Sequence, residues 1–466
     1  MYSDILLKGW TEENQLQAPS MKDQPAFYRN LEKALDTRRQ TQSLMSMKPR
    51  WDESVTDFTT CDFLSLSRSG RVREKFLAEL ASHPGFDLSA SGSRIQYGNY
   101  SYLNEVEQEI ADFHGAECVY LTQSGFAANV GVLSGVPLPG DAIVYDELAH
   151  ASSHEGFHLS LAEHKIPFRH NSVEALREVL VTLKNTVPGF QTGTRSVLIC
   201  VESIYSMDGD VCHLQEFVQV AKEEFPLGNA QFVVDEAHSI GVIGDRGKGL
   251  VCMLGLERDI AIRIHVASKA LGSVGGMILC NKTIRYMLLN HARSITFSCA
   301  PSFPMVASIR AGYQCLMSGE TQEAQETIQR NVKHFFTLLT SNPIWDEAVE
   351  EGLLRIPLLE DDWESRPFQT HIVPLRTRPG HVMFLFFQLT LNNMNAYPMV
   401  FPVVPKGETR IRLVFHAHNT FAQIDALVST ICDWASEMLS IQHADSEITL
   451  PKAARRVYAM QTAATA

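Results

Sequence analysis

Between residues 117 and 279 the chain alternates short apolar runs with stretches of helical periodicity. The runs are rich in β-branched and aromatic residues, as expected for strands buried on both faces. Strands that alternate with helices are typical of an α/β domain, because parallel strands need a crossover connection that is usually a helix. We therefore predict a largely parallel sheet, with strands at 118–122, 142–145, 197–201, 232–234, 262–266 and 277–279.

The flanking segments show helical spacing. Leu31 and Leu35 recur at helical intervals near the N-terminus, and Thr420 and Gln423 form a capping-box pattern late in the chain. A length of 466 residues favours one large domain with a smaller companion. We predict an N-terminal helical arm over 1–57, a large domain over 58–310, a smaller α+β C-terminal domain over 311–445, and a tail over 446–466 that adds little to the core.

Charge and cysteine content exclude several classes of function. The formal net charge of −13 is spread along the chain, which disfavours binding to phosphate backbones and therefore to nucleic acid. No apolar run approaches the roughly 20 residues of a membrane helix, and the N-terminus lacks the apolar stretch of a secretory signal. The nine cysteines show no CxxC pair. We expect a cytoplasmic protein without a membrane span, a metal site or a nucleic-acid partner.

Asp235 ends the predicted strand at 232–234. A carboxylate at the end of a buried strand is costly unless a positive group meets it. A protonated pyridine nitrogen is such a group, and pyridoxal 5'-phosphate (PLP) chemistry needs this carboxylate to keep its ring cationic. The alternative is an Asp235 that only caps the next turn.

Lys269 directly follows the predicted strand at 262–266, among small residues and before Gly272. The carboxyl ends of parallel strands meet at one edge, where binding sites form. A lysine at that edge has room to form an imine with a carbonyl cofactor. The alternative is an ordinary exposed lysine in a loop.

Two other segments reach the same edge. Ser124, Gly125 and Phe126 open a helix after the strand at 118–122, and the free N–H groups at a helix N-terminus suit a phosphate. Ser124 can equally be a simple N-cap. His150 follows the strand at 142–145, where its imidazole can lie flat on an aromatic ring.

Residues 235–238 spell DEAH, which also occurs in helicases. A helicase needs a phosphate loop of the form GxxxxGK[ST]. The nearest candidate, 244–249, has the wrong spacing and no hydroxyl after Lys248. The acidic charge balance argues in the same direction, so a nucleotide-driven motor is disfavoured.

Taken together, these segments resemble the α-oxoamine synthase family of fold-type I PLP enzymes. The resemblance covers nearly the whole chain, and 206–210 and 235–239 are its most specific parts. It implies a fold-type I large domain and a decarboxylative condensation of a small amino acid (glycine, alanine or serine) with an acyl thioester carried by coenzyme A or a carrier protein. The matching segments are 31–39, 57–58, 62–67, 92–94, 124–129, 150–152, 202–210, 235–249, 268–272 and 410–412.

The resemblance also assigns roles to residues. Lys269 binds PLP and moves the α-proton, Asp235 pairs with the ring nitrogen, and His150 stacks on the ring and can polarise the thioester carbonyl. It places Arg412 and Arg94 at the substrate, where a guanidinium matches a carboxylate in two-pronged geometry. The remaining cofactor-binding residues that it implies are Ser124, Gly125, Phe126, Ser206, His238, Ser268 and Ser298. Ser298 reaches the partner's PLP, which implies a homodimer with shared active sites.

The chain departs from the family pattern at several positions. Val266 replaces a threonine that donates to the phosphate, and Cys61 replaces an asparagine near the substrate carboxylate. Cys299 and Leu103 replace a hydroxyl residue and a histidine. Val400 stands where oxononanoate synthases carry an arginine. Without that cation a dicarboxylic acyl group loses a partner, so we predict a neutral acyl chain.

Two other functions remain open from the sequence. One is amino-acid transamination by a PLP enzyme of the same fold, which would not release carbon dioxide in response to an acyl thioester. The other is a non-catalytic partner subunit, since the family contains subunits that have lost the lysine. The presence of Lys269 disfavours the second.

Overall fold

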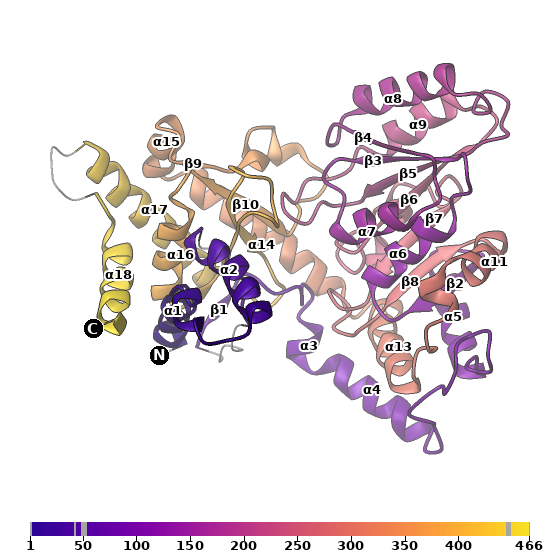
Figure 1. The fold of residues 1–466 in the computed structure, drawn as a ribbon, viewed down its shortest axis with the longest axis horizontal. Helices are drawn as coiled ribbons and strands as arrows, with labels where there is room; N and C mark the ends of the chain where they lie inside the picture. Colours follow the sequence, from indigo (N-terminus) through magenta and orange to yellow (C-terminus); the bar gives the residue numbers. More distant parts are fainter. Residues whose placement is uncertain (1, 42, 48–53, 444–448, 466) are drawn as a thin grey trace. The chain divides into compact units, whose positions relative to one another are not determined.

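The computed structural model describes residues 2–41, 43–47, 54–443 and 449–465, which divide into two compact units. The first unit comprises residues 1–60 and 329–466, and the second comprises 61–328 (Figure 1). Positions 1, 42 and 48–53 of the predicted arm, 444–445 of the predicted small domain, and 446–448 and 466 of the predicted tail lie outside the described residues. In the part of the chain that is described, no helix is both long enough and apolar enough to cross a membrane.

The second unit is built on a seven-stranded sheet with strand order β2-β8-β7-β6-β5-β3-β4. Only β8 runs antiparallel to its neighbours. The predicted mostly parallel α/β sheet is therefore confirmed, with β4 as a strand that the sequence reasoning missed. The strands are β2 (Cys118–Thr122), β3 (Ala142–Asp146), β4 (His164–Phe168), β5 (Val197–Glu202), β6 (Ala230–Asp235), β7 (Ile262–Val266) and β8 (Gly276–Cys280).

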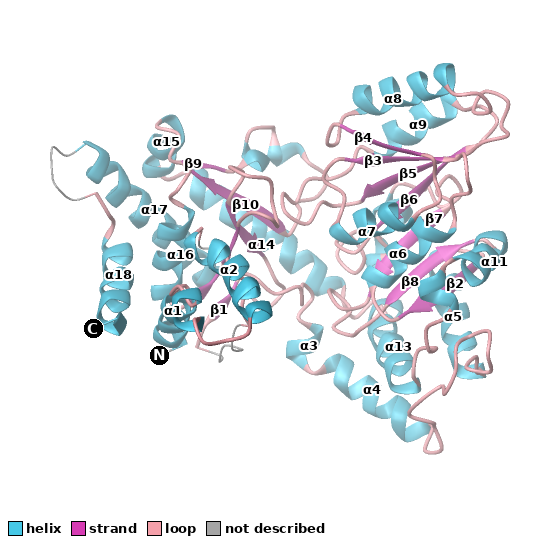
Figure 2. Cartoon of the chain, viewed as in Figure 1, coloured by secondary structure: helices cyan, strands magenta, loops and turns pink. Residues whose placement is uncertain are grey.

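Helices cover both faces of this sheet (Figure 2). On one face α8 (Val173–Thr186) and α9 (Leu214–Glu224) bury leucines against alternate residues of β3, β5 and β6. On the other face α6 (Gly125–Gly135), α7 (Ala151–Leu159) and α11 (Lys282–His291) pack on the intervening residues. The unit also contains α3 (Leu66–Ser69), α4 (Arg71–Ser82), α5 (Ser101–His114), η2 (Asp245–Gly247), α10 (Leu250–Met253), α12 (Arg293–Thr296) and α13 (Phe303–Met317).

The first unit has a four-stranded antiparallel sheet of order β12-β13-β10-β9 and a two-stranded sheet of β1 and β11. The strands are β1 (Thr56–Asp57), β9 (Leu354–Arg355), β10 (Ile372–Thr377), β11 (Met394–Asn395), β12 (Tyr397–Met399) and β13 (Arg410–Val414). The helices are α1 (Tyr2–Glu13), η1 (Ala18–Met21), α2 (Ala26–Gln40), α15 (Pro343–Glu350), η3 (Pro357–Leu359), η4 (Trp363–Ser365), α16 (Val382–Leu391), α17 (Phe421–His443) and α18 (Lys452–Thr465), while α14 (Gln322–Thr340) begins in the second unit and ends in this one.

The predicted capping box at the start of α17 is confirmed. The side chain of Gln423 accepts a hydrogen bond from the N–H of Thr420, and Thr420 Oγ1 accepts one from the N–H of Gln423. The prediction that the tail adds little to the core is wrong. Its helix α18 packs against α1 and α16, where Ala453, Ala454 and Val457 are fully or almost fully buried.

The small unit also begins later than residue 311, the predicted boundary. Residues 311–328 belong to the second unit because α13 packs against α4 and α5 there. The predicted N-terminal arm contributes to the core of the first unit, since Leu6, Leu7 and Trp10 of α1 are buried in it.

Candidate active site

Loops that follow four parallel strands meet at the carboxyl edge of the large sheet. Strands β2, β3, β5, β6 and β7 run in the same direction, so their carboxyl ends share one edge. The predicted residues Ser124, His150, Ser206 and Lys269 follow β2, β3, β5 and β7, and Asp235 is the last residue of β6. The topology brings these five positions to one edge.

The Asp235 carboxylate is buried and held by two donors. Asn129 Nδ2 of α6 donates to Asp235 Oδ2 at 2.7 Å, and the N–H of Ala237 donates to Oδ1 at 2.9 Å. Asp235 is only 7% exposed. A buried carboxylate with a fixed orientation is suited to a cationic partner in front of it. The sequence does not reveal this role of Asn129, because an asparagine inside a helix carries no such signal.

The Lys269 amine lies beside a histidine. Lys269 Nζ is 2.7 Å from His238 Nε2, and the ring of Phe63 packs on His238 with ring centroids 5.8 Å apart. Lys269 is partly buried and His238 is 4% exposed. The amine is therefore held at the end of β7, next to the end of β6.

His150 is oriented by hydrogen bonds at its ring and its backbone. The N–H of Ser152 donates to His150 Nδ1 at 3.2 Å, so a neutral imidazole carries its proton on Nε2. The N–H of His150 donates to Glu202 Oε1 at 2.7 Å. Desolvation at the sheet edge lowers the pKa of His150, which outweighs the Asp235 carboxylate that raises it. The ring is therefore neutral near pH 7.

Glu202 is a buried carboxyl group that the sequence reasoning did not single out. It ends β5 directly opposite Asp235 in the strand register and is 5% exposed. Burial raises the pKa of Glu202 well above its usual range, and the Asp235 carboxylate raises it further. Glu202 therefore binds a proton more readily than an exposed glutamate does, while it holds the backbone of His150.

Helix α6 begins against the end of β7. Ser124 is the N-cap, and its Oγ accepts from the N–H of Ala127 at 3.1 Å. A Cβ on Gly125 would lie 2.3 Å from Val266 Cγ2, so only glycine fits between helix and strand. The first N–H groups of a helix have no carbonyl partner within it, which leaves those of Gly125 and Phe126 at the sheet edge for an anion.

Comparison with known proteins identifies the family of this site. The family model for aminotransferase class I and II matches residues 53–431. The aminoacyl transferase sphA of Aspergillus fumigatus is 50% identical over 97% of each chain, and the 8-amino-7-oxononanoate synthase of Emericella nidulans is 42% identical over 83% of this chain and 90% of its own. A structure of SPT with PLP superimposes with a TM-score of 0.68 at 25% identity, covering 82% of this chain and 87% of its own.

The chain belongs to the α-oxoamine synthase family of PLP-dependent enzymes. It is a fold-type I PLP-dependent acyltransferase that condenses a small amino acid with an acyl group with loss of carbon dioxide. The residues present fit PLP. Asp235 is a buried, oriented carboxylate that suits the ring nitrogen, the Lys269 amine lies at the same edge of the sheet, and the N-terminus of α6 suits the phosphate.

The other predicted cofactor residues lie at or near this edge. Ser206 is half-buried in the loop after β5, and Ser268 is exposed beside Lys269. Ser298 is exposed, and its hydroxyl donates to the Ser294 carbonyl. The next residue, Cys299, accepts from the Gln123 side chain at 2.9 Å, so this segment runs beside the start of α6.

Arg94 is held by a neighbouring carboxylate and two asparagine side chains in this structure. Its guanidinium makes a two-pronged ion pair with Glu107, with N···O distances of 2.6 and 3.0 Å, and lies 4.8 Å above the Tyr120 ring. Asn99 and Asn104 also accept from it. The side chain is 5% exposed. Arg94 therefore ties the 92–100 loop to α5, and its role at the substrate stays a prediction.

Arg412 lies in the other unit, on β13, and is half-buried. Tyr397 of β12 stands directly opposite it in the antiparallel register, and residues paired in this way share a face of the sheet. A guanidinium on that face can bind a carboxylate by two parallel hydrogen bonds.

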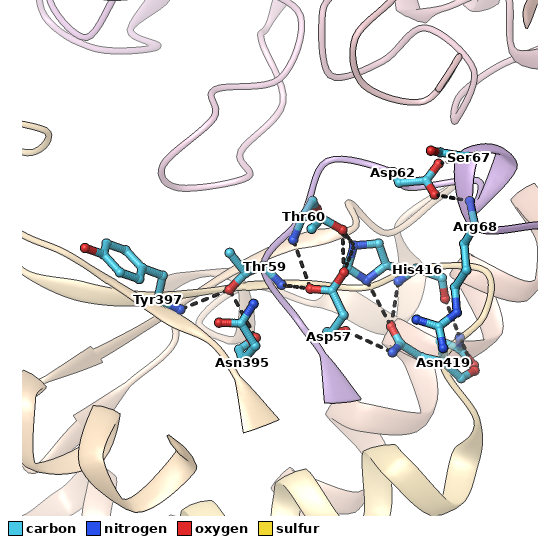
Figure 3. A network of polar contacts seen from close by, with 11 residues as sticks. Asp57, Thr59, Thr60, Asp62, Ser67, Arg68, Asn395, Tyr397, His416 and Asn419 are labelled. Atoms are coloured by element: carbon cyan, nitrogen blue, oxygen red, sulfur yellow. Dashed lines mark hydrogen bonds and ion pairs between the residues drawn. The ribbon is translucent and has the colours of Figure 1, made fainter. Parts of the chain in front are cut away.

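A polar network fixes the loop that follows β13 (Figure 3). His416 Nε2 donates to the Thr60 carbonyl at 2.9 Å, Asn419 Nδ2 donates to the Asp57 carbonyl at 3.0 Å, and Asp57 Oδ1 accepts from the N–H of Thr59 at 2.9 Å. Asp57, His416 and His418 place possible metal-ligand atoms within 4.8 Å of one another. Asp57 and His416 already take part in the hydrogen bonds described above. These bonds join β1 to the loop at the end of β13.

Proposed function

We propose that Lys269 is the residue that binds PLP and moves the proton at the α-carbon of the amino acid. The observation that carries this proposal is the position of Lys269 Nζ at the end of β7, 2.7 Å from His238 and next to the strand that ends in Asp235. PLP supplies an electron-accepting ring to this site. Asp235 keeps the ring nitrogen protonated, because its carboxylate is oriented and shielded from water.

The neighbouring residues take supporting roles in this proposal. His150 lies against the ring and presents its Nε2 proton to the acyl carbonyl, where a donor stabilises developing negative charge. His238 and Ser206 lie near the ring hydroxyl. The phosphate is held by Ser124, by the N–H groups of Gly125 and Phe126, by Ser268, and by Ser298 of a second copy.

The acyl group that this enzyme accepts is a neutral chain presented as a thioester. An apolar pocket of the first unit supports this choice. Its walls come from α1, α16, β12 and the segment after β12, and among the described residues that line it none is charged. Val400 is one of these residues, at the position where oxononanoate synthases carry an arginine. The lining residues are Leu6, Trp10, Ser43, Leu44, Met45, Met383, Phe386, Tyr397, Pro398, Met399, Val400 and Val403.

The pocket adjoins the proposed carboxylate-binding residue. Tyr397 lines the pocket and also stands opposite Arg412 across β12 and β13. In this arrangement Arg412 binds the carboxylate of the amino acid, while the uncharged walls beyond Tyr397 receive the acyl chain. Burying an unpaired carboxylate in such a pocket would cost several kcal/mol, which supports a neutral acyl group over a dicarboxylic one.

Val400→Arg tests this substrate assignment. The variant adds a cation to the pocket, so we expect kcat/KM for a dicarboxylic monothioester to rise by roughly tenfold and that for a neutral thioester to fall. Val349→Arg, an exposed position on α15, is the matched control and should leave both values unchanged. A wild-type enzyme that prefers the dicarboxylic thioester would contradict the assignment.

The enzyme acts as a homodimer in the cytoplasm in this proposal, and the donor is an acyl coenzyme A or an acyl carrier protein. The dimer can be tested by mixing two impaired variants, Lys269→Ala and Ser298→Ala. If Ser298 serves the partner's site, each mixed dimer contains one site without either substitution and activity is restored on mixing, whereas a Ser298 that serves its own subunit's site gives no restoration. Sedimentation that shows only monomers in the active enzyme would contradict the dimer.

A further inference from the structure

His170 lies between two carboxylates on different loops of the second unit. Its Nδ1 is 2.8 Å from Asp146 Oδ1, and its Nε2 is 2.8 Å from Asp210 Oδ2. The side chain of Asp146 is fully buried, and those of His170 and Asp210 are 22% and 25% exposed. The ring of Tyr205 meets the His170 ring edge-on, with centroids 4.5 Å apart. Both ring nitrogens therefore face acceptors, which an imidazolium satisfies by donating from each.

The contact between His170 and Asp146 fixes the segment that leads to His150. Asp146 Oδ1 also accepts from the N–H of Leu148 at 2.9 Å, and the Asp146 carbonyl accepts from Ala149 at 3.0 Å. The N–H of His170 donates to Glu147 Oε1 at 2.9 Å. The turn between β3 and α7, which ends in His150, is therefore held at its start by His170 and at its end by Glu202.

The contact between His170 and Asp210 fixes the loop that carries Ser206. This loop closes on itself, since the N–H of Tyr205 donates to the Asp210 carbonyl at 3.1 Å and that of Gly209 donates to the Tyr205 carbonyl at 2.8 Å. Asn171, at φ 50°, adds bonds from its side chain to Asp210 Oδ2 at 3.1 Å and to the Val211 carbonyl at 2.8 Å. The base of the loop is thus attached to the His170-Asn171 turn.

We propose that His170 is a positioning residue, whose imidazolium holds the His150 segment and the Ser206 loop in a fixed relation at the cofactor edge. The charge is essential to this role, because without it the Asp146 and Asp210 carboxylates would face each other as like charges. In agreement, hydrogen bonds to these two carboxylates raise the pKa of His170 to about 10 despite its desolvation. The inference rests on the roles proposed above for His150 and Ser206.

His170→Gln tests the proposal, with His158→Gln on the exposed side of α7 as the matched control. We expect kcat to fall by roughly 10²-fold, as misplacement of reacting groups by about 1 Å can cause, with a smaller change in the KM for the amino acid. The visible circular dichroism of bound PLP should change, because it reports how the ring is held. In the PLP-free protein, amide hydrogen exchange should accelerate in both 147–150 and 203–212.

A second variant separates positioning from folding. Adding Asp210→Asn to His170→Gln removes the repulsion and should restore part of the lost activity, whereas Asp210→Asn alone should accelerate exchange in 203–212 and leave 147–150 unchanged. If His170→Gln does not fold, the inference is tested by the hydrogen-exchange pattern of the Asp210→Asn variant alone. Unchanged kcat, circular dichroism and exchange in His170→Gln would overturn the inference. A wild-type enzyme without acyl-dependent release of carbon dioxide would instead overturn the proposed function.

Discussion

Gly125→Ala is expected to disturb the start of α6, where the phosphate is proposed to bind. The added Cβ would lie 2.3 Å from Val266 Cγ2 and 3.3 Å from Cγ1. Val266 is 7% exposed and β-branched, so it has few alternative rotamers. Overpacking of this kind costs about 1–3 kcal/mol. The smaller unfolded-state entropy of alanine offsets about 0.4–1 kcal/mol of that loss.

From the middle of each range the net loss is about 1.3 kcal/mol, which corresponds to a fall in melting temperature of roughly 3–5 °C for a unit of this size. Thermal unfolding should be followed on the PLP-free protein, since bound cofactor would add its own stabilisation. Gly85→Ala is the matched control, because a Cβ there meets nothing within 4 Å. Its melting temperature should slightly exceed that of the wild type, because only the unfolded-state effect of about 0.4–1 kcal/mol acts there.

The pairwise contact can be isolated with Val266→Ala. If the clash is the cause, the double variant Gly125→Ala/Val266→Ala will be more stable than the sum of the two single effects by about 1–3 kcal/mol. The double variant should also bind PLP more tightly than Gly125→Ala does. Equal melting temperatures for wild type and Gly125→Ala, or additive effects in the double variant, would refute the reasoning.

Two further variants probe the same edge. Val266→Thr restores a hydroxyl next to the proposed phosphate site at nearly equal volume. A hydrogen bond to a charged group is worth about 1.5–3 kcal/mol, so the dissociation constant for PLP should fall at least about tenfold in a fluorescence titration. Weaker binding of PLP would contradict the proposed phosphate site. Glu202→Gln keeps an acceptor for the His150 N–H but cannot ionise. The pKa of Glu202 is raised in the folded protein, so the wild type loses stability as pH rises above about 4.5. At pH 8 the melting temperature of Glu202→Gln should therefore exceed that of the wild type. This difference should shrink toward pH 5. A margin independent of pH would show that Glu202 does not titrate as described.

Much of the large domain could be predicted from the sequence because its strands are buried on both faces. Such strands read as short apolar runs between helical segments, and β2 and β7 have the predicted bounds. Strand β4 was missed because it lies at the sheet edge, where His164 and Lys165 interrupt the apolar pattern. The tail was underestimated because the core residues that α18 buries most fully, Ala453, Ala454 and Val457, are small or single in the sequence and give a weak hydrophobic signal.

The candidate site was predictable only where a residue ends a strand. Asp235 and Lys269 could be found in this way, since the ends of parallel strands share an edge. The roles of Asn129, Glu202 and His170 depend on contacts between segments far apart in the chain, as in the Asn129–Asp235 bond. The ion pair between Arg94 and Glu107 is likewise visible only in the structure.

Carbon dioxide release tests the central claim most directly. The purified enzyme should be incubated with PLP and an amino acid labelled at its carboxyl carbon, with and without a neutral acyl thioester, beside the Lys269→Ala variant. The account predicts labelled carbon dioxide only when wild-type enzyme, amino acid and thioester are all present. Formation of a keto acid without carbon dioxide, as in transamination, or undiminished release by Lys269→Ala, would contradict it.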